Sequence, residues 1–126
     1  MGNDGGTGRS GGDLQGRTRA YALEVIRFVQ GLPRDMPAQV MGRQLLRSGT
    51  SVGANYRAAC RAKSLADFIA KMGIVEEEAD ECLYWLDLLG TSGLADELVV
   101  ARMAGEGNAI VALTVASIRT AKARRP

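Results

Sequence analysis

The chain has 126 residues, of which 46% are hydrophobic and 24% charged, and its formal net charge is +2. This length and composition predict one soluble globular domain. The chain contains no histidine, which argues against a histidine-based catalytic triad and against a zinc site. The net charge is too small to indicate nucleic-acid binding by itself, so its distribution along the chain matters more.

The first 16 residues hold seven glycines and few apolar side chains. Such a segment cannot bury enough surface to offset the entropy lost on ordering, so we expect 1–16 to be a flexible Gly-rich tail and 17–123 to be the folded domain. No secretory signal precedes the domain, and no apolar run approaches the ~20 residues that span a bilayer. Cys60 and Cys82 are outside any metal-ligand spacing. These features predict a cytoplasmic protein with free thiols and no membrane association.

The first helix is expected over 17–30, and Gly31 and Pro33 are typical of a helix end. Its apolar positions recur at spacings of four, three and four: Tyr21, Val25, Phe28 and Leu32.

The second helix is expected from about Pro37 to Ala62. One of its faces is basic and continues into a lysine just past the helix: Arg43, Arg47, Arg57, Arg61 and Lys63. The opposite face has polar residues at two core positions, Ser48 and Asn55, which commonly fix helix register. We expect Asn55 to form a hydrogen bond with a glutamate of the third helix. The helical periodicity continues through three glycines, which indicate close approach of another helix: Gly42, Gly49 and Gly53.

The third helix is expected to begin after Ser64, an N-cap residue with an acidic residue three positions on, and to end at Gly90. Its apolar positions keep a seven-residue repeat from Leu65 to Leu89, the pattern of bundle packing. A second stripe runs outside that repeat: Ile74, Glu78, Glu81, Trp85 and Leu88.

The fourth helix is expected over 95–122, and Gly105 and Gly107 are expected to be its weak point. Its inward residues are expected to be Leu98, Val99, Met103, Ile110, Leu113 and Ser117. Because no segment alternates with period two and the turns are short, the predicted fold is all-α: an antiparallel up-down-up-down four-helix bundle.

The two charged surfaces leave alternatives open. The stripe from Ile74 to Leu88 is either a solvated face or a subunit interface anchored by Trp85. The basic face of the second helix is an intersubunit surface, a phosphate- or nucleic-acid-binding surface, or merely solubilising. Five carboxylates crowd 76–81, but consecutive helical residues point in different directions, so a metal site is not expected. No cofactor and no catalytic residue is expected.

The stretch from Leu45 to Leu89 resembles a bacterial four-helix-bundle family first noticed as reading frames in intervening sequences of 23S ribosomal RNA genes. The resemblance rests on a block that reads R-S-G-T-S-V-G-A-N at residues 47–55, in which Arg47, Ser48, Ser51, Val52 and Asn55 match the family, and on Phe68 and the acidic run at 76–81. Many members read N-I-A-E-G from the asparagine onward, whereas this chain has Ala58 in place of the glutamate. Any role of that carboxylate therefore does not carry over.

The resemblance implies a homopentameric ring and a relation to accessory proteins of diversity-generating retroelements, whose basic ring surfaces associate with nucleic acid and a reverse transcriptase. It implies no enzymatic activity. The function expected is a non-enzymatic, ring-forming interaction or scaffold protein that binds RNA, DNA or a nucleic-acid enzyme through its arginines. The alternative is an adaptor for a protein partner, with no nucleic-acid role.

Overall fold

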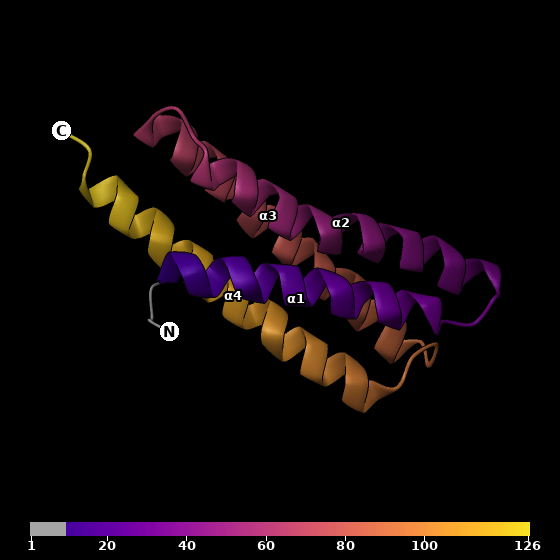
Figure 1. The fold of residues 1–126 in the computed structure, drawn as a ribbon. Helices are drawn as coiled ribbons and strands as arrows, with labels where there is room; N and C mark the ends of the chain where they lie inside the picture. The colour runs from indigo at the N-terminus through magenta and orange to yellow at the C-terminus, as the bar shows by residue number, and fades with distance from the viewer. Residues whose placement is uncertain (1–9) are drawn as a thin grey trace.

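The structure, a computed structural model, describes residues 10–126 and shows four α-helices and no strand in that range. The helices are α1 (Ser10–Gln30), α2 (Met36–Cys60), α3 (Leu65–Thr91) and α4 (Glu97–Ala123). Helices adjacent in sequence pack together, and α1 also contacts α4, so the four form a closed bundle. The short loops alternate between the two ends of an elongated molecule (Figure 1), which is consistent with an up-down-up-down arrangement.

Local signals set the helix ends. Ser64 Oγ accepts a hydrogen bond from the Asp67 amide at 3.0 Å, which confirms the expected N-cap of α3. Asp35 and Asp96 cap α2 and α4 in the same way. Asp35 Oδ1 accepts from the Ala38 amide at 2.9 Å, and Asp96 Oδ1 accepts from the Leu98 amide at 2.8 Å. The expected end of α3 at Gly90 is wrong, because Gly90 lies inside the helix and packs on Val100. Gly93, with a φ of 80°, makes the turn instead.

The core follows the predicted heptad of α3. Every member of that repeat from Met72 to Leu89 is buried, and Phe68 packs partly buried against the cluster. The predicted stripe of α1 is also confirmed: Tyr21 and Val25 are fully buried, and Leu32 is nearly so. Charged contacts lie at the rim of the bundle, where Arg17 pairs with Glu106 at 2.8 Å and joins α1 to α4.

The first helix begins earlier than its composition suggested. Helix α1 starts at Ser10 rather than near residue 17, and Leu14 and Thr18 are each only 2% exposed. Leu14 and Thr18 extend the Tyr21–Val25 stripe backward by one helical turn each, and this tertiary packing outweighs the low helix propensity of the glycines. Residues 1–9 of the expected tail lie outside the described residues.

The glycines of α2 allow α1 to approach closely, as predicted. A Cβ at Gly42 would lie 2.9 Å from Leu32 Cδ1, and one at Gly49 would lie 2.9 Å from both γ-carbons of Val25. At Gly53 the nearest atom is the Thr18 carbonyl oxygen, 3.5 Å from such a Cβ. The three glycines therefore line the seam between the two helices.

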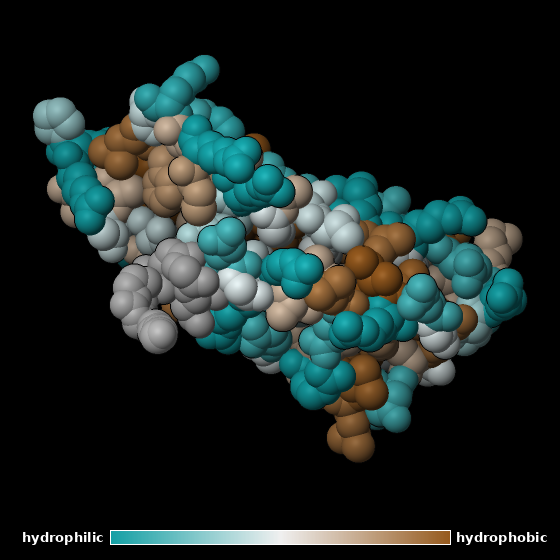
Figure 2. All heavy atoms as spheres, in the orientation of Figure 1, coloured by the Kyte–Doolittle hydropathy of each residue, from teal (hydrophilic) through white to brown (hydrophobic). Residues whose placement is uncertain are grey.

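The phase predicted for α4 is partly wrong. Leu98 is 83% exposed, and Val100 takes the inward position in its turn, followed by Met103, Gly107, Ile110 and Thr114. The reason is that Asp96 caps the helix, so Leu98 falls in the first turn on the solvent side; Figure 2 shows hydrophobic atoms exposed at that end of α4. Gly107 is buried in close contact with α1 and α3 rather than exposed at a weak point.

Helix α4 also meets the length and composition criteria for a membrane-crossing helix, although only 28% of the qualifying window is buried by the bundle. Apolar helices of packed bundles meet the same criteria, so a single such helix is weak evidence for a membrane span.

Candidate anion site and the polar contacts of the second helix

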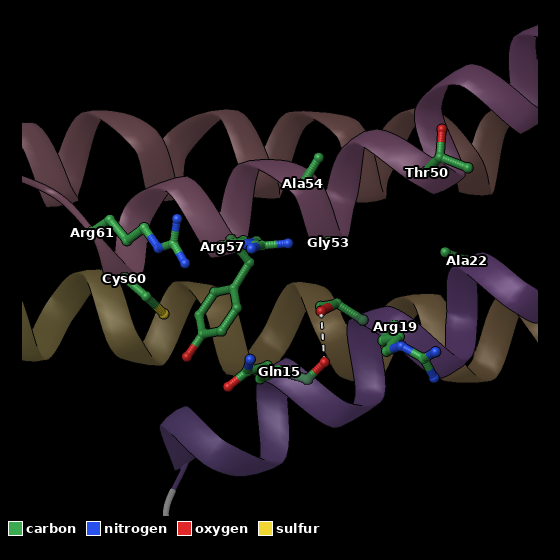
Figure 3. A pocket seen from close by; sticks show the side chains of 11 residues that line it. Gln15, Arg19, Ala22, Thr50, Gly53, Ala54, Arg57, Cys60 and Arg61 are labelled. Atoms are coloured by element: carbon green, nitrogen blue, oxygen red, sulfur yellow. Dashed lines mark hydrogen bonds between the residues drawn. The ribbon is translucent and has the colours of Figure 1, made fainter.

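A hollow of about 620 Å³ lies between α1 and α2, in the half of the bundle that contains the start of α1 and the end of α2. Its lining includes three small residues, Ala22, Gly53 and Ala54. Among the described residues, three arginines line it: Arg19 from α1, Arg57 from the last turn of α2, and Arg61, which is the C-cap residue of α2 (Figure 3). The site therefore combines cations from two helices around one concave surface.

Among residues 14–126, whose side chains the structure describes, no carboxylate lines this hollow. The three arginines are exposed, and none of them forms a salt bridge with a residue of 14–126, the part of the chain whose side chains are described. Arg57 lies in the last turn of α2, where a cation also stabilises the negative end of the helix dipole. Their donors remain available to an anion, and the guanidinium group is suited to bidentate contacts with phosphate or carboxylate.

Neutral polar groups complete the wall of the hollow. Gln15 and Thr50 line it, and so do Tyr56 and Cys60 of α2. Burial raises the pKa of Tyr56, and a hydrogen bond with Cys60 raises it further, so the phenol is protonated at neutral pH. The thiol of Cys60 belongs to an exposed residue, whereas Cys82 is buried in the core.

Arg47 has partners in its own chain. Its Nη1 lies 3.2 Å from Glu78 Oε1, and its Nη2 forms an ion pair with Glu81, both on α3. Glu81 Oε2 also accepts a hydrogen bond from the Trp85 indole N–H at 3.0 Å. The hydrogen bond from Trp85, followed by that from Arg47, lowers the pKa of the Glu81 carboxyl. Arg47 therefore joins α2 to α3 through these ion pairs, whereas Arg57 and Arg61 form no such pair with the described side chains.

Trp85 also contacts the aromatic ring of Tyr84. The ring centroids of Tyr84 and Trp85 lie 5.0 Å apart in an edge-to-face arrangement. Within the stripe that contains Trp85, Ile74 is 40% exposed, and the remaining members are half-buried. The predicted stripe is therefore partly exposed, with apolar and charged side chains on it, and Trp85 also packs against the core.

The two predicted buried polar residues differ. Ser48 is fully buried: its hydroxyl donates to the Gln44 carbonyl at 3.0 Å and accepts from the Cys82 thiol at 3.4 Å. Burial raises the pKa of Cys82 to about 11, so this thiol is protonated at neutral pH. Asn55 is only half-buried, and its amide donates to the Ser51 carbonyl at 2.8 Å. The expected contact of Asn55 with a glutamate is wrong, because the side chain returns to its own helix.

The remaining members of the predicted basic face are separated along α2. Arg43 and Lys63 are exposed and do not line the hollow, so the structure brings only Arg57 and Arg61 of that set together there. Sequence reasoning missed Gln15 and Arg19. They share one flank of α1 with Ala22, at spacings of four and three, which would have revealed them had the helix been extended back through residue 15.

Among residues 14–126, whose side chains are described, no group of three His, Cys, Asp or Glu side chains is placed to hold a metal ion.

The sequence profile of the 23S rRNA-intervening sequence protein family matches residues 13–116. The chain belongs to this family. A similar solved structure comes from Bacteroides thetaiotaomicron VPI-5482 and is described as a protein of unknown function from the S23 ribosomal protein family. That protein is 32% identical, the match covers 87% of this chain and 98% of the other, and the TM-score is 0.83. A comparison with curated proteins gives no match.

In this member of the 23S rRNA-intervening sequence protein family, the block at residues 47–55 is part of the packing between helices. Arg47 forms an ion pair with Glu78 of α3, and the Ser48 hydroxyl accepts a hydrogen bond from the Cys82 thiol of α3. The Asn55 amide donates to the Ser51 carbonyl within α2. The block therefore explains how α2 docks on α3. The hollow lies on the other side of α2, toward α1.

Proposed function

We propose that this protein is a non-enzymatic scaffold that assembles into a homopentameric ring and binds RNA or DNA, or an enzyme acting on them, through exposed arginines. The observation that carries the nucleic-acid part is the hollow between α1 and α2. There, Arg19, Arg57 and Arg61 line one concave surface, and no carboxylate of residues 14–126 lines it with them. Arginine pairs bidentately with phosphate, and phosphate contacts supply most of the affinity of nucleic-acid-binding proteins.

The ring is supported by the surface of α3. A bundle helix buries one stripe against its neighbours, yet α3 carries a second one with Ile74, Trp85 and Leu88 on it. Tryptophan anchors are typical of protein interfaces. When one such surface meets a different surface of the next subunit, the heterologous contact closes into a ring if the rotation allows. The family resemblance supplies the expectation of five subunits.

The assembly is tested by sedimentation velocity of the full chain. We expect a mass several times the 13.4 kDa of one chain. Ile74→Glu places a charge on the proposed interface and should dissociate the oligomer. Leu98→Glu is the matched control, because Leu98 is the more exposed apolar residue and lies outside the stripe. A monomeric wild-type protein at micromolar concentration would contradict the ring.

Nucleic-acid binding is tested by titrating labelled RNA and DNA at two salt concentrations. We expect affinity that falls steeply as salt rises, because bound cations release counterions from the phosphates. The double variant Arg57→Glu/Arg61→Glu should lose binding and keep the oligomer. The double variant Arg119→Glu/Arg125→Glu, at two exposed arginines outside the hollow, controls for the same change in net charge. Absence of binding to any nucleic acid at low salt would overturn this part and leave the adaptor for a protein partner.

A further inference from the structure

We infer that the hollow between α1 and α2 is a site for a single nucleotide unit, either free or within a single strand, whose phosphate is held by Arg57, Arg61 and Arg19. The inference rests on the proposed nucleic-acid function and specifies what that surface recognises. It starts from the size and shape of the hollow, whose volume of about 620 Å³ is within the ~300–1,000 Å³ typical of small-molecule pockets.

The lining matches the two chemical parts of a nucleotide. Arginines from α1 and α2 supply cationic donors for a phosphate, as Figure 3 shows for Arg19, Arg57 and Arg61. Ala22, Gly53 and Ala54 also line the hollow, and their small side chains leave room for a base or a sugar. Gln15 and Thr50 add amide and hydroxyl groups that can bond the polar edge of a base.

The geometry favours a single strand over a duplex. In a duplex the bases are stacked and paired, and the phosphates lie on a convex outer surface, so no base can enter a pocket without leaving the stack. A single strand or a free nucleotide has its base available. Because the arginines line a concave site and come from two helices, a duplex would reach only some of them.

The reactivity of the Cys60 thiol can report whether a ligand occupies the hollow. Cys60 is exposed and lines the hollow, whereas Cys82 is buried, and burial raises its pKa to about 11, so one thiol per chain should react under native conditions. A nucleotide in the hollow should slow alkylation of Cys60 by iodoacetamide. Conversely, N-ethylmaleimide on Cys60 should fill part of the hollow and leave the three arginines in place.

The experiment uses the full-length protein and measures two quantities. Fluorescence anisotropy gives the affinity for a labelled deoxythymidine oligomer and for a duplex of the same length. Mass spectrometry gives the rate of Cys60 alkylation with the oligomer, with AMP and with inorganic phosphate. We expect the single strand to bind at least tenfold more tightly than the duplex. Arg57→Gln and Arg61→Gln should each weaken it by about 10- to 100-fold, the range for a hydrogen bond to a charged group.

Matched controls separate the hollow from general charge. Arg43→Gln removes an arginine from the same helix at a position outside the hollow and should leave the preference for single strands intact. N-ethylmaleimide should abolish single-strand binding by the wild type and have no effect on Cys60→Ser. Circular dichroism of each variant confirms that the bundle is folded.

The outcomes distinguish the two proposals. Protection of Cys60 by AMP assigns the site to a free nucleotide, and protection by the oligomer alone assigns it to a nucleotide within a strand. Equal binding of single strand and duplex, with Cys60 unprotected by either, overturns the nucleotide site while nucleic-acid binding stands. Protection by inorganic phosphate equal to that by AMP also overturns it, because the site then recognises only an anion. Protection by AMP without binding of any strand overturns the nucleic-acid function and supports the nucleotide site.

Discussion

Gly49 of α2 lies directly against Val25 of α1, so that a Cβ at Gly49 would come within 2.9 Å of both Val25 γ-carbons and 3.1 Å of its Cβ. Val25 is fully buried and β-branched, so it cannot rotate away from the new methyl group. We therefore expect Gly49→Ala to lower the free energy of unfolding by about 1–3 kcal/mol, the usual cost of overpacking a core. Urea denaturation followed by circular dichroism measures this change.

Gly105 is the matched control for Gly49. It lies inside α4, is exposed, and has no atom within 4 Å of an added Cβ. Gly105→Ala should therefore raise the stability by up to ~1 kcal/mol, because alanine is the better helix former. A stabilising Gly49→Ala would show that the two helices separate at little cost, contrary to the close contact described above.

The contacts of Arg47 should be visible in the fluorescence of Trp85, which is the chain's single tryptophan. Arg47 holds Glu81, and Glu81 accepts the indole N–H of Trp85. Arg47→Met should free the carboxylate, loosen the indole and increase quenching of its emission by acrylamide. Arg43→Met removes an exposed arginine of the same helix and should leave the emission unchanged. Equal quenching in the wild type and in Arg47→Met would show that Arg47 does not position the ring.

Acid should weaken the same contacts. The folded protein lowers the pKa of Glu81, through Trp85 first and Arg47 second. The carboxylate therefore contributes stability above the ordinary glutamate pKa of about 4.3, and this contribution is lost as the pH falls through the lowered folded value. We expect Glu81→Gln to flatten the acid limb of the stability–pH curve. Glu77→Gln, at an exposed position of the same helix, should leave that limb as it is in the wild type.

Features that depend on local residue spacing could be predicted from the sequence. Features that depend on packing against a helix distant in the sequence could not. The heptad of α3 and the cap at Ser64 are local patterns, and both are confirmed. In α4, three apolar residues in succession at 98–100 leave the inward phase undetermined until α3 and α1 pack against it.

The candidate site divides in the same way. The arginines of α2 could be recognised as one basic face, but only the packing of α1 shows which of them surround a hollow. Arg47 was assigned to that face as well. Its partners Glu78 and Glu81 lie more than 30 positions along the chain, and only the register of α3 against α2 brings them within reach.

Tyr21 and Gly107 should be energetically coupled. Among buried side-chain polar atoms of the described residues, the Tyr21 hydroxyl is the one without a hydrogen-bond partner, and it would lie 3.0 Å from a Cβ at Gly107. Tyr21→Phe removes a buried, unsatisfied hydroxyl and should raise the stability by roughly 1 kcal/mol. Gly107→Ala should cost about 1–3 kcal/mol in the wild type by overpacking.

In the Tyr21→Phe background, Gly107→Ala should cost less. The contact with the hydroxyl is then gone, and the other close atom, Leu83 Cδ2 at 2.9 Å, is the far end of a flexible side chain that can rotate. We expect a coupling energy of at least ~0.5 kcal/mol from the four variants of the double-mutant cycle, measured by urea denaturation. Additive effects would mean that α4 moves away from α1 as a whole, so that the hydroxyl never limits the space at Gly107.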